Sequence, residues 1–270
     1  MDDRASDQHL VTAIRHAYED GADGWASGPT PVYRRLAEAL VRATPVPLVD
    51  RSVLDLGAGT GVASQALLDV GAHPVGVDLA ESMLRHRQSQ RPPGVVADAQ
   101  LLPFAGGAFD AVVAAFSLNH LPDPAAGLAE CRRVVRADGV VLASTFPADA
   151  DHPAKSIVES VLVAFGYHRP DWYRTFKDRI AARTGDARQL GQAADRAGLV
   201  DTEVVREEVE AGLDRPELAV AWRLNMPHTI AFVAGLDPEV RARLRTRALA
   251  ALSDDLPSTV PMLVLRARAA

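Results

Sequence analysis

Short apolar segments alternate with amphipathic segments through the middle of the chain. The predicted strands cover residues 52–56, 74–78, 95–98, 111–116 and 139–146. The predicted helices between them cover residues 62–70, 82–90 and 124–135. Each strand is a short continuous apolar run, which is typical of strands buried on both faces. The alternation of strands and helices predicts βαβ units and a mostly parallel sheet.

The flanking regions have a helical rhythm instead. The expected helices cover residues 7–22, 32–42, 150–182, 186–198 and 214–252, and further strands are expected at 202–209 and 259–266. Glycines and prolines at 21–31, around Trp25, predict a break between the first two helices. Beyond residue 146, the pattern predicts two helical insertions around the end of the sheet.

The composition suits one large globular domain. Of 270 residues, 48% are apolar and 24% are charged, so a packed core is expected. The net charge of -6 argues against a dedicated nucleic-acid binder, which usually has a basic face. The chain has no apolar window long enough for a membrane span, and its first residues lack the apolar region of a secretory signal. We therefore expect a cytoplasmic protein without nucleic acid or membrane as a partner.

Cysteine and histidine patterns exclude several chemistries. Cys131 is the only cysteine, so neither an intrachain disulfide nor a structural thiolate zinc site is expected. The H-E-x-x-H, C-x-x-C and P-loop patterns do not occur, so no metal is predicted. Cys131 falls in a predicted helix away from the sheet edge, where we expect a buried thiol rather than a nucleophile.

The first predicted strand leads into a glycine turn. Residues 53–61 read VLDLGAGTG, with a glycine at every second position after the strand. Glycine lets the backbone bend sharply and approach a ligand, and the following helix points its N-terminus at the same place. Val62 stands where the dinucleotide fingerprint has its third glycine, so pyrophosphate binding and a nicotinamide oxidoreductase are disfavoured.

Acidic residues end the next two predicted strands. Asp78 follows the glycine turn by about 20 residues, where an acid can accept both ribose hydroxyls of a nucleoside. Asp98 ends the third strand, where a carboxylate beside a free backbone N–H can recognise the edge of an adenine. The glycine turn combined with both acids is more specific than any of these elements alone.

These segments resemble the class I S-adenosylmethionine-dependent methyltransferases, in particular the small-molecule branch with a UbiE-like core. The resemblance covers about residues 50–147 and is carried by residues 53–61, 76–84, 97–104, 109–113 and 132–142. It implies a Rossmann-like, mostly parallel sheet of seven strands, the last one antiparallel, with helical lid insertions. A single methyltransferase domain is then expected over 1–270. Its expected parts are a helical cap (1–49), a cofactor-binding core (50–147), a substrate lid (148–185 and 212–257) and a last strand (259–268).

The resemblance also implies S-adenosylmethionine as cofactor and a set of residues around it. The three glycines of the turn would lie under the methionine part, and Asp55 would support their loop. Asp78 would hold the ribose hydroxyls, and Asp98 would recognise the adenine. The expected cofactor-binding residues are Tyr18, Trp25, Asp55, Gly57, Ala58, Gly59, Thr60, Gly61, Asp78, Leu79, Met83, Asp98, Ala99, Gln100, Phe116 and Ser117.

His120 follows the fourth predicted strand and is the candidate general base. It lies at the carboxyl edge of the sheet, and an unperturbed histidine titrates near neutral pH. The alternative is that His120 binds the cofactor or caps a helix. Aromatic residues in the lid predict an enclosed acceptor site, although single rings there can serve only to pack the lid. The expected substrate-binding residues are His120, Phe146, Tyr167, His168, Trp172 and Tyr173.

The expected function is the transfer of a methyl group from S-adenosylmethionine to an O, N or C atom of a small organic molecule, with a secondary metabolite as the expected acceptor. Two alternatives stay open. The first is a cyclase or pericyclase that holds the cofactor without consuming it. The second is a binding module without catalysis. Demethylation of the cofactor during turnover distinguishes the expected function from both.

Overall fold

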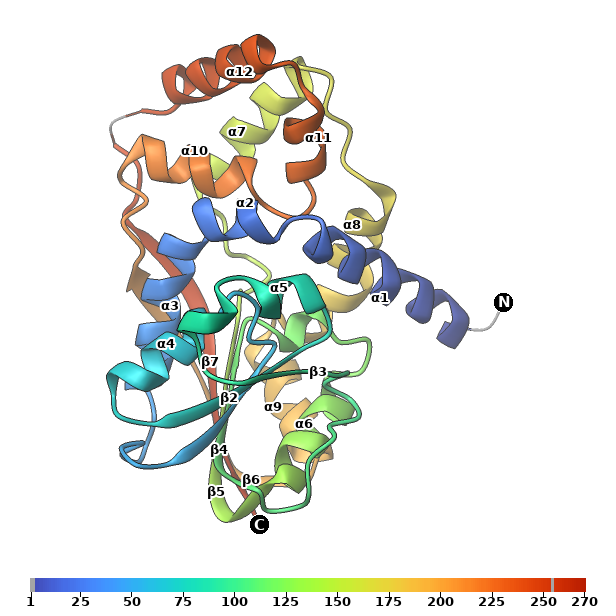
Figure 1. Cartoon of the computed structure of the whole chain (residues 1–270), viewed down its shortest axis with the longest axis vertical. Helices are drawn as coiled ribbons and strands as arrows, with labels where there is room; N and C mark the ends of the chain where they lie inside the picture. The colour runs from blue at the N-terminus through green and yellow to red at the C-terminus, as the bar shows by residue number, and fades with distance from the viewer. Residues whose placement is uncertain (1–2, 254) are drawn as a thin grey trace.

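The computed structural model describes residues 3–253 and 255–270, with a seven-stranded sheet of order β3-β2-β1-β4-β5-β7-β6 at its centre (Figure 1). The strands are β1 (Ser52–Leu56), β2 (His73–Asp78), β3 (Gly94–Val96), β4 (Phe109–Ala115), β5 (Val135–Thr145), β6 (Leu199–Glu210) and β7 (Thr259–Ala269). The first five strands pair in parallel, whereas β7 runs antiparallel to both β5 and β6. The predicted α/β fold, with a mostly parallel sheet and an antiparallel last strand, is confirmed.

Neighbouring residues of one strand face opposite helical layers. Val53 packs in the same cluster as Leu36 and Leu67, whereas Leu54 packs in the cluster that contains Leu128 and Leu190. The first layer contains α3 (Thr30–Arg42) and α4 (Val62–Asp69), and the second contains α6 (Pro124–Val134) and α9 (Ala187–Arg196). Because helices cover both faces of the central strands, β1 and β4 carry mostly apolar side chains, as the continuous apolar runs indicate.

Two further helical groups lie beyond the carboxyl ends of the parallel strands (Figure 1). The N-terminal group is α1 (Asp3–Glu19) and α2 (Ala22–Ser27). The second group is α7 (Pro153–Ala164), α8 (Asp171–Thr175), α10 (Pro216–Leu224), α11 (Ile230–Gly235) and α12 (Pro238–Ala251). Within the described residues, no helix combines the length and the apolar character that a membrane crossing requires.

The predicted break at 21–31 is only partly right: turns at residues 20–21 and 28–29 separate the first two predicted helices, but the short helix α2 lies between them. The glycines of this segment also allow close packing. A Cβ on Gly24 would lie 1.8 Å from Cδ1 of Ile230, and a Cβ on Gly28 would lie 2.5 Å from the carbonyl oxygen of Ala221. The small glycines let α2 approach α10 and α11 closely. Trp25, which belongs to α2, is buried.

Three predicted helices are shorter or more divided than expected. The helix at 82–90 ends early: α5 (Glu81–Arg85) is followed by a 3₁₀ turn (Gln88–Gln90), and Arg87 between them has a φ of 50°. The segment 150–182 divides after Gly166, whose φ is 92°. It forms α7 and α8, then a π-helical turn (Phe176–Ile180) and a 3₁₀ turn (Ala181–Thr184). The segment 214–252 divides into α10, α11 and α12.

We predict that Cys131 does not react with thiol reagents in the folded protein. Its side chain is buried in α6, and burial raises the pKa of its thiol to about 12. Because only the thiolate is nucleophilic, labelling should follow global unfolding and accelerate with denaturant. Titration with a chromogenic disulfide reagent, with and without guanidinium, measures this. Rapid stoichiometric labelling of the native protein would contradict the placement of this residue.

Candidate functional site

A cavity of about 800 Å³ lies between the carboxyl ends of the parallel strands and the two helical groups above them. Residues that follow β1, β2, β4 and β5 line its lower half, and residues of α1, α7, α8 and α10 line the rest. Ligands of open α/β sheets bind at this edge, because the strand ends and the N-termini of the following helices meet there. The cavity is therefore the candidate functional site.

The glycine turn between β1 and α4 forms one wall of the cavity. Gly57 has a φ of 71°, and a Cβ on it would lie 2.3 Å from Cβ of Ser117. Only glycine therefore allows the turn to pass this close to the segment after β4. The N–H groups of Gly57 and Ala58 both donate to the carbonyl oxygen of Val77, at 2.8 and 2.9 Å. These contacts attach the turn to the end of β2.

Asp78 ends β2 beside the glycine turn. Its Oδ2 accepts a hydrogen bond from the N–H of Gly59 at 2.8 Å, and its Oδ1 accepts one from the N–H of Ala80 at 2.9 Å. Burial raises the pKa of the Asp78 carboxyl, although these N–H donors oppose the shift. The Asp78 carboxylate therefore both stabilises the turn and faces the cavity.

Asp55 and Arg91 support the glycine turn from outside the cavity. Nη1 of Arg91 donates to the carbonyl oxygens of Gly59 at 2.8 Å and of Met83 at 3.0 Å. Oδ2 of Asp55 accepts a hydrogen bond from Oγ of Ser64 at 2.6 Å. Arg91 therefore connects the turn to the end of α5, and Asp55 connects β1 to α4.

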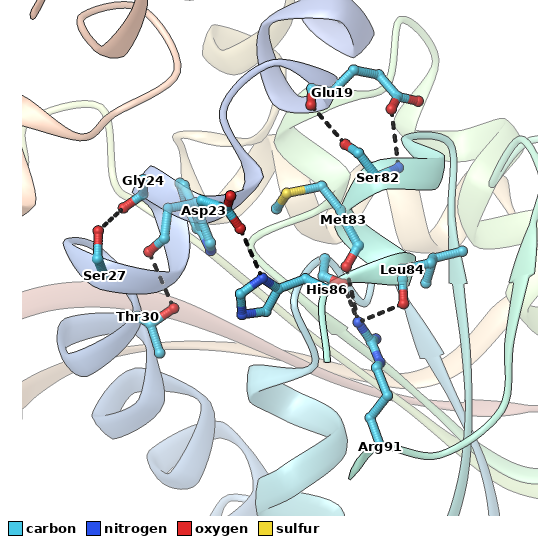
Figure 2. A network of polar contacts seen from close by, with 12 residues as sticks. Glu19, Asp23, Gly24, Ser27, Thr30, Ser82, Met83, Leu84, His86 and Arg91 are labelled. Atoms are coloured by element: carbon cyan, nitrogen blue, oxygen red, sulfur yellow. Dashed lines mark hydrogen bonds and ion pairs between the residues drawn. The ribbon is translucent and has the colours of Figure 1, made fainter. Parts of the chain in front are cut away.

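Polar contacts hold the N-terminal helices over α5 (Figure 2). The carboxylate of Glu19 accepts hydrogen bonds from the N–H groups of Glu81 at 2.7 Å and Ser82 at 3.0 Å, at the start of α5. Oγ of Ser82 donates to the carbonyl oxygen of Glu19 at 2.8 Å, and His86 lies 3.3 Å from Asp23. Glu19 thus satisfies the free N–H groups of a helix that lies more than sixty residues further along the chain.

Aromatic rings from distant segments form a continuous wall of the cavity. Tyr33 is at its centre, with ring centroids 4.8 Å from Trp25, 5.4 Å from Phe116 and 6.0 Å from Phe146. Phe116 has a φ of 55°, which is strained for a residue other than glycine. Its N–H nevertheless donates to the carbonyl oxygen of Ser144 at 3.0 Å. The fold thus holds this ring against the wall at a cost in backbone energy.

His120 occupies the cavity wall between the N-terminal helix and the lid. Its Nε2 lies 3.0 Å from the hydroxyl of Tyr18, and its ring stacks on Phe176 at 5.0 Å between centroids. Burial lowers the pKa of His120 to about 4, because the charged ring would lose its hydration. The imidazole is therefore neutral at physiological pH and can accept or donate one hydrogen bond on each side.

The cavity brings together most of the residues expected from the sequence. Its lining includes Tyr18, Trp25, Gly57, Ala58, Gly59, Thr60, Asp78, Leu79, Met83, Asp98, Ala99, Gln100, Phe116, Ser117, His120, Phe146, Trp172 and Tyr173. Asp55 and Gly61 lie outside the lining. Asp55 is buried behind the turn, and Gly61 begins α4 with a φ of 91°.

Two residues expected to bind the substrate lie elsewhere. The ring of Tyr167 packs against Phe232 at 5.4 Å, and its hydroxyl donates to the carbonyl oxygen of His228 at 3.0 Å. Tyr167 is thus an internal contact between helices of the lid. His168 is exposed and does not line the cavity. Gly166 ends α7 here, so the chain turns and directs these two neighbouring side chains away from the cavity.

Several lining residues were missed by the sequence analysis. They are Tyr33, Lys155, Lys177, Trp222, Arg223 and His228. All except Tyr33 come from the expected lid, residues 148–185 and 212–257, to which the resemblance does not extend. One signal was visible in the sequence: Arg223 interrupts the apolar run 218–224. A charged residue on a buried helix face requires a specific polar environment.

Comparison with known proteins adds an independent observation. Residues 54–143 match a family model described as a methyltransferase domain. The demethylmenaquinone methyltransferase of Renibacterium salmoninarum is 32% identical over 148 residues, which are 54% of this chain and 61% of that protein. The demethylmenaquinone methyltransferase of Mycolicibacterium gilvum is 32% identical over 181 residues, covering 64% of this chain and 77% of that protein. The chain thus spans less than two thirds of the first relative's length.

One solved structure illustrates the shared fold. A putative methyltransferase from an antibiotic biosynthesis pathway of Anabaena variabilis superposes with a TM-score of 0.60 at 16% identity. The match covers 85% of this chain and 96% of that one. At this identity the likeness describes the arrangement of helices and strands alone.

We predict a pH-dependent stability contribution from Asp55. Burial raises the pKa of its carboxyl to about 6, above the value of an unfolded chain, so the folded state binds the proton more tightly. The protonated carboxyl therefore stabilises the folded state fully below about pH 4, and this stabilisation is lost as the pH rises through about 6. Between pH 4 and pH 7, the free energy of unfolding of Asp55→Asn should therefore increase by on the order of 2 kcal/mol relative to that of the native protein. Urea unfolding of both proteins at each pH measures this, and a pH-independent difference would contradict it.

Proposed function

Because this chain belongs to the class I S-adenosylmethionine-dependent methyltransferases, whose cofactor is S-adenosylmethionine, we propose that it transfers a methyl group to an O, N or C atom of a small organic molecule. One observation carries the proposal: a single cavity joins the glycine turn and Asp78 to a chamber walled by aromatic rings. The first part suits the cofactor, and the second suits an acceptor that must be held away from water.

The polar atoms in the lower half of the cavity fit this cofactor. Oγ1 of Thr60, Oγ of Ser117 and Oδ1 of Asn119 are buried on the cavity wall without a hydrogen-bond partner in the described structure. S-adenosylmethionine carries an ammonium group, a carboxylate, ribose hydroxyls and an adenine amino group that such atoms can bind. We propose that Asp78 holds the ribose hydroxyls and that Asp98 recognises the adenine amino edge.

When bound, S-adenosylmethionine supplies a methyl group that its sulfonium centre has already activated. The protein then has to bind the acceptor, orient its nucleophilic atom and exclude water. Phe116 and Phe146, whose rings lie 4.4 Å apart, can form an apolar surface for this purpose. Tyr18 can close the same space from the N-terminal helix, since its ring lies 5.5 Å from both Trp25 and His120.

His120 is the proposed proton acceptor for acceptors that carry a proton on the nucleophilic atom. Its neutral ring lies in the cavity wall, where it can accept a hydrogen bond from a hydroxyl or amine. The low pKa of about 4 makes it a weak base, so orienting the acceptor is a larger part of its role than deprotonation in advance. Acceptors that carry no proton would not need this group.

Apart from Phe116 and His120, the acceptor side of the cavity is formed by residues outside the matched segment 54–143. Phe146, Trp172, Tyr173 and Trp222 are among them. A shared core combined with a separate lid supports an acceptor that differs from that of the relatives, and we propose a secondary metabolite. Demethylmenaquinone, which the relatives' name specifies, is the acceptor to test beside it.

Methyl transfer is tested with the purified protein, S-adenosylmethionine and a panel of small aromatic acceptors and quinones. S-adenosylhomocysteine and methylated product should form in equal amounts. Product that forms without S-adenosylhomocysteine would instead indicate a cyclase that retains its cofactor. Tight cofactor binding without turnover of any panel member would favour a binding module.

We predict that Asp78→Asn weakens binding of S-adenosylhomocysteine by about 1.5–3 kcal/mol, since a charge-assisted hydrogen bond is lost. Asparagine keeps one acceptor oxygen for the N–H groups that Asp78 now holds. Calorimetric titration measures the affinity, and thermal melting verifies that the variant is folded. Asp69→Asn, on an exposed position of α4, is the matched control. An unchanged affinity in Asp78→Asn would overturn the ribose assignment.

We predict that His120→Ala lowers the turnover number about 100-fold, at the lower end of general acid–base effects, with a smaller change in cofactor affinity. The measurement compares steady-state kinetics with titration of S-adenosylhomocysteine. Tyr18→Phe, which removes only the hydroxyl 3.0 Å from Nε2, shows how much of the effect comes from that contact. Equal losses of turnover and affinity would make His120 a binding residue instead.

A further inference from the structure

Three cationic side chains gather in the lid half of the cavity. Arg223 on α10 is only 8% exposed, Lys155 on α7 is half-buried, and Lys177 is exposed at the rim. All three line the cavity. This concentration of positive charge is notable in a chain whose net charge is -6.

None of these three cations has a carboxylate within ion-pair distance among the described residues. Two acids that also line this half of the cavity are already engaged: Glu159 pairs with Arg169, and Asp149 pairs with Arg206 at 2.8 Å. A third, Asp151, is near enough to favour the charged form of Lys155 but forms no ion pair with it. Lys155 donates instead to the carbonyl oxygen of Ala150 at 2.7 Å. A buried cation without a partner is costly, so the positive charge of Arg223 is not explained by the protein alone.

The side chains that contact Arg223 are uncharged: they are His228, Trp222 and Tyr173, whose hydroxyl is hydrogen-bonded to Arg223. Its Nη2 lies 3.4 Å from Nε2 of His228, and its guanidinium lies 5.0 Å from the ring centre of Trp222. Because arginine can only donate, Nε2 of His228 must accept, which leaves the proton of the neutral ring on Nδ1. Burial and the nearby Arg223 lower the pKa of His228 well below its usual value, so the ring stays neutral.

Two N–H donors on the side chains beside Arg223 lack an acceptor. Nδ1 of His228 and Nε1 of Trp222 are buried without a hydrogen-bond partner in the described structure. Their side chains are 5% and 1% exposed, and both residues line the cavity. Buried N–H groups are almost always satisfied, so this cluster indicates a missing acceptor. An acceptor next to Arg223 and Lys155 would also have to be an anion for the charges to balance.

We propose that Arg223, together with Lys155 and the free N–H groups of Trp222 and His228, binds a carboxylate or phosphate group of the methyl acceptor. This inference rests on the proposed function and specifies its substrate class: an acceptor with an anionic group at one end and an apolar body at the other. Lys177 at the rim attracts the same charge during entry.

The position of Lys155 places the anionic end relative to the aromatic wall. Its Nζ lies 5.8 Å from the ring centre of Phe146, which belongs to the wall beside Phe116. Burial and repulsion from Arg223 and Lys177 lower the pKa of Lys155 to about 8, and attraction to Asp151 only partly opposes this shift. An acceptor anchored between Lys155 and Arg223 would extend its body along Phe146 towards the glycine turn.

The test measures binding rather than turnover. The protein saturated with S-adenosylhomocysteine is titrated with benzoate, phenyl phosphate and benzamide, followed by tryptophan fluorescence and calorimetry. Benzamide has nearly the shape of benzoate but no charge. At least one anion should bind tenfold or more tightly than benzamide, with selectivity that weakens at high salt. Equal affinities for all three compounds would overturn the proposal.

Substitutions in the lid test whether the anion binds at Arg223 and Lys155. Arg223→Met keeps the aliphatic stem over Trp222. It should reduce the ratio of anion affinity to benzamide affinity to near one. Lys155→Met should reduce it several-fold and serves as the second variant if Arg223→Met is not folded. Arg245→Met, on an exposed position of α12, should behave as the unaltered protein. Selectivity that persists in both lid variants would overturn the proposal.

Cofactor affinity separates this proposal from the proposed function. The alternative source of a carboxylate is the amino-acid end of the cofactor itself. Arg223→Met could weaken the binding of S-adenosylhomocysteine tenfold and leave the binding of 5′-methylthioadenosine unchanged. The cluster would then bind the amino-acid end of the cofactor, and the proposal would be wrong. If S-adenosylhomocysteine fails to bind the unaltered protein, the proposed function fails, whereas anion selectivity can still be measured without it.

Discussion

The close approach of the glycine turn to the segments after β2 and β4 is the constraint on which the site depends. Gly57 leaves no room for a Cβ beside Ser117, and the turn donates two hydrogen bonds to Val77. Asp78 then reaches the N–H of Gly59. Because hydrogen bonds join the turn to the end of β2 and the segment after β4 packs against it, one short motif brings together backbone donors, a carboxylate and the N-terminus of α4. The rest of the cavity is built around this arrangement.

Contacts between distant segments complete the site. Glu19 caps α5 from the N-terminal helix, and Arg91 ties the end of α5 to the glycine turn. Tyr33 joins the N-terminal helices to the rings that follow β4 and β5. The N-terminal helices, α5 and the carboxyl edge of the sheet are therefore joined by direct contacts around the cavity.

The two halves of the cavity have different chemical characters. The lower half presents the carboxylates of Asp78 and Asp98 and the unpartnered oxygens of Thr60, Ser117 and Asn119, which suit hydroxyl, amine and ammonium groups. The lid half presents cations and free N–H groups, which suits an anion. Aromatic rings separate them and limit water at the point where the two ligands would meet. Under the proposed function, this asymmetry would give the cofactor and the acceptor separate places in the cavity.

The sequence alone determined the sheet, the glycine turn and Asp78 at the end of β2, whereas Asp98 lies just beyond β3, which ends at Val96 rather than at the predicted residue 98. These follow from local rules: apolar runs form buried strands, positive φ requires glycine, and parallel strands end at one edge. Only the tertiary structure decided that residues 22–27 form a helix, that Tyr167 and His168 lie away from the cavity, and that Arg223, Lys155, Trp222 and His228 share one end of it. Those outcomes depend on how the lid helices pack and turn against each other. Such packing is set by contacts between residues far apart in the chain, which no local pattern encodes.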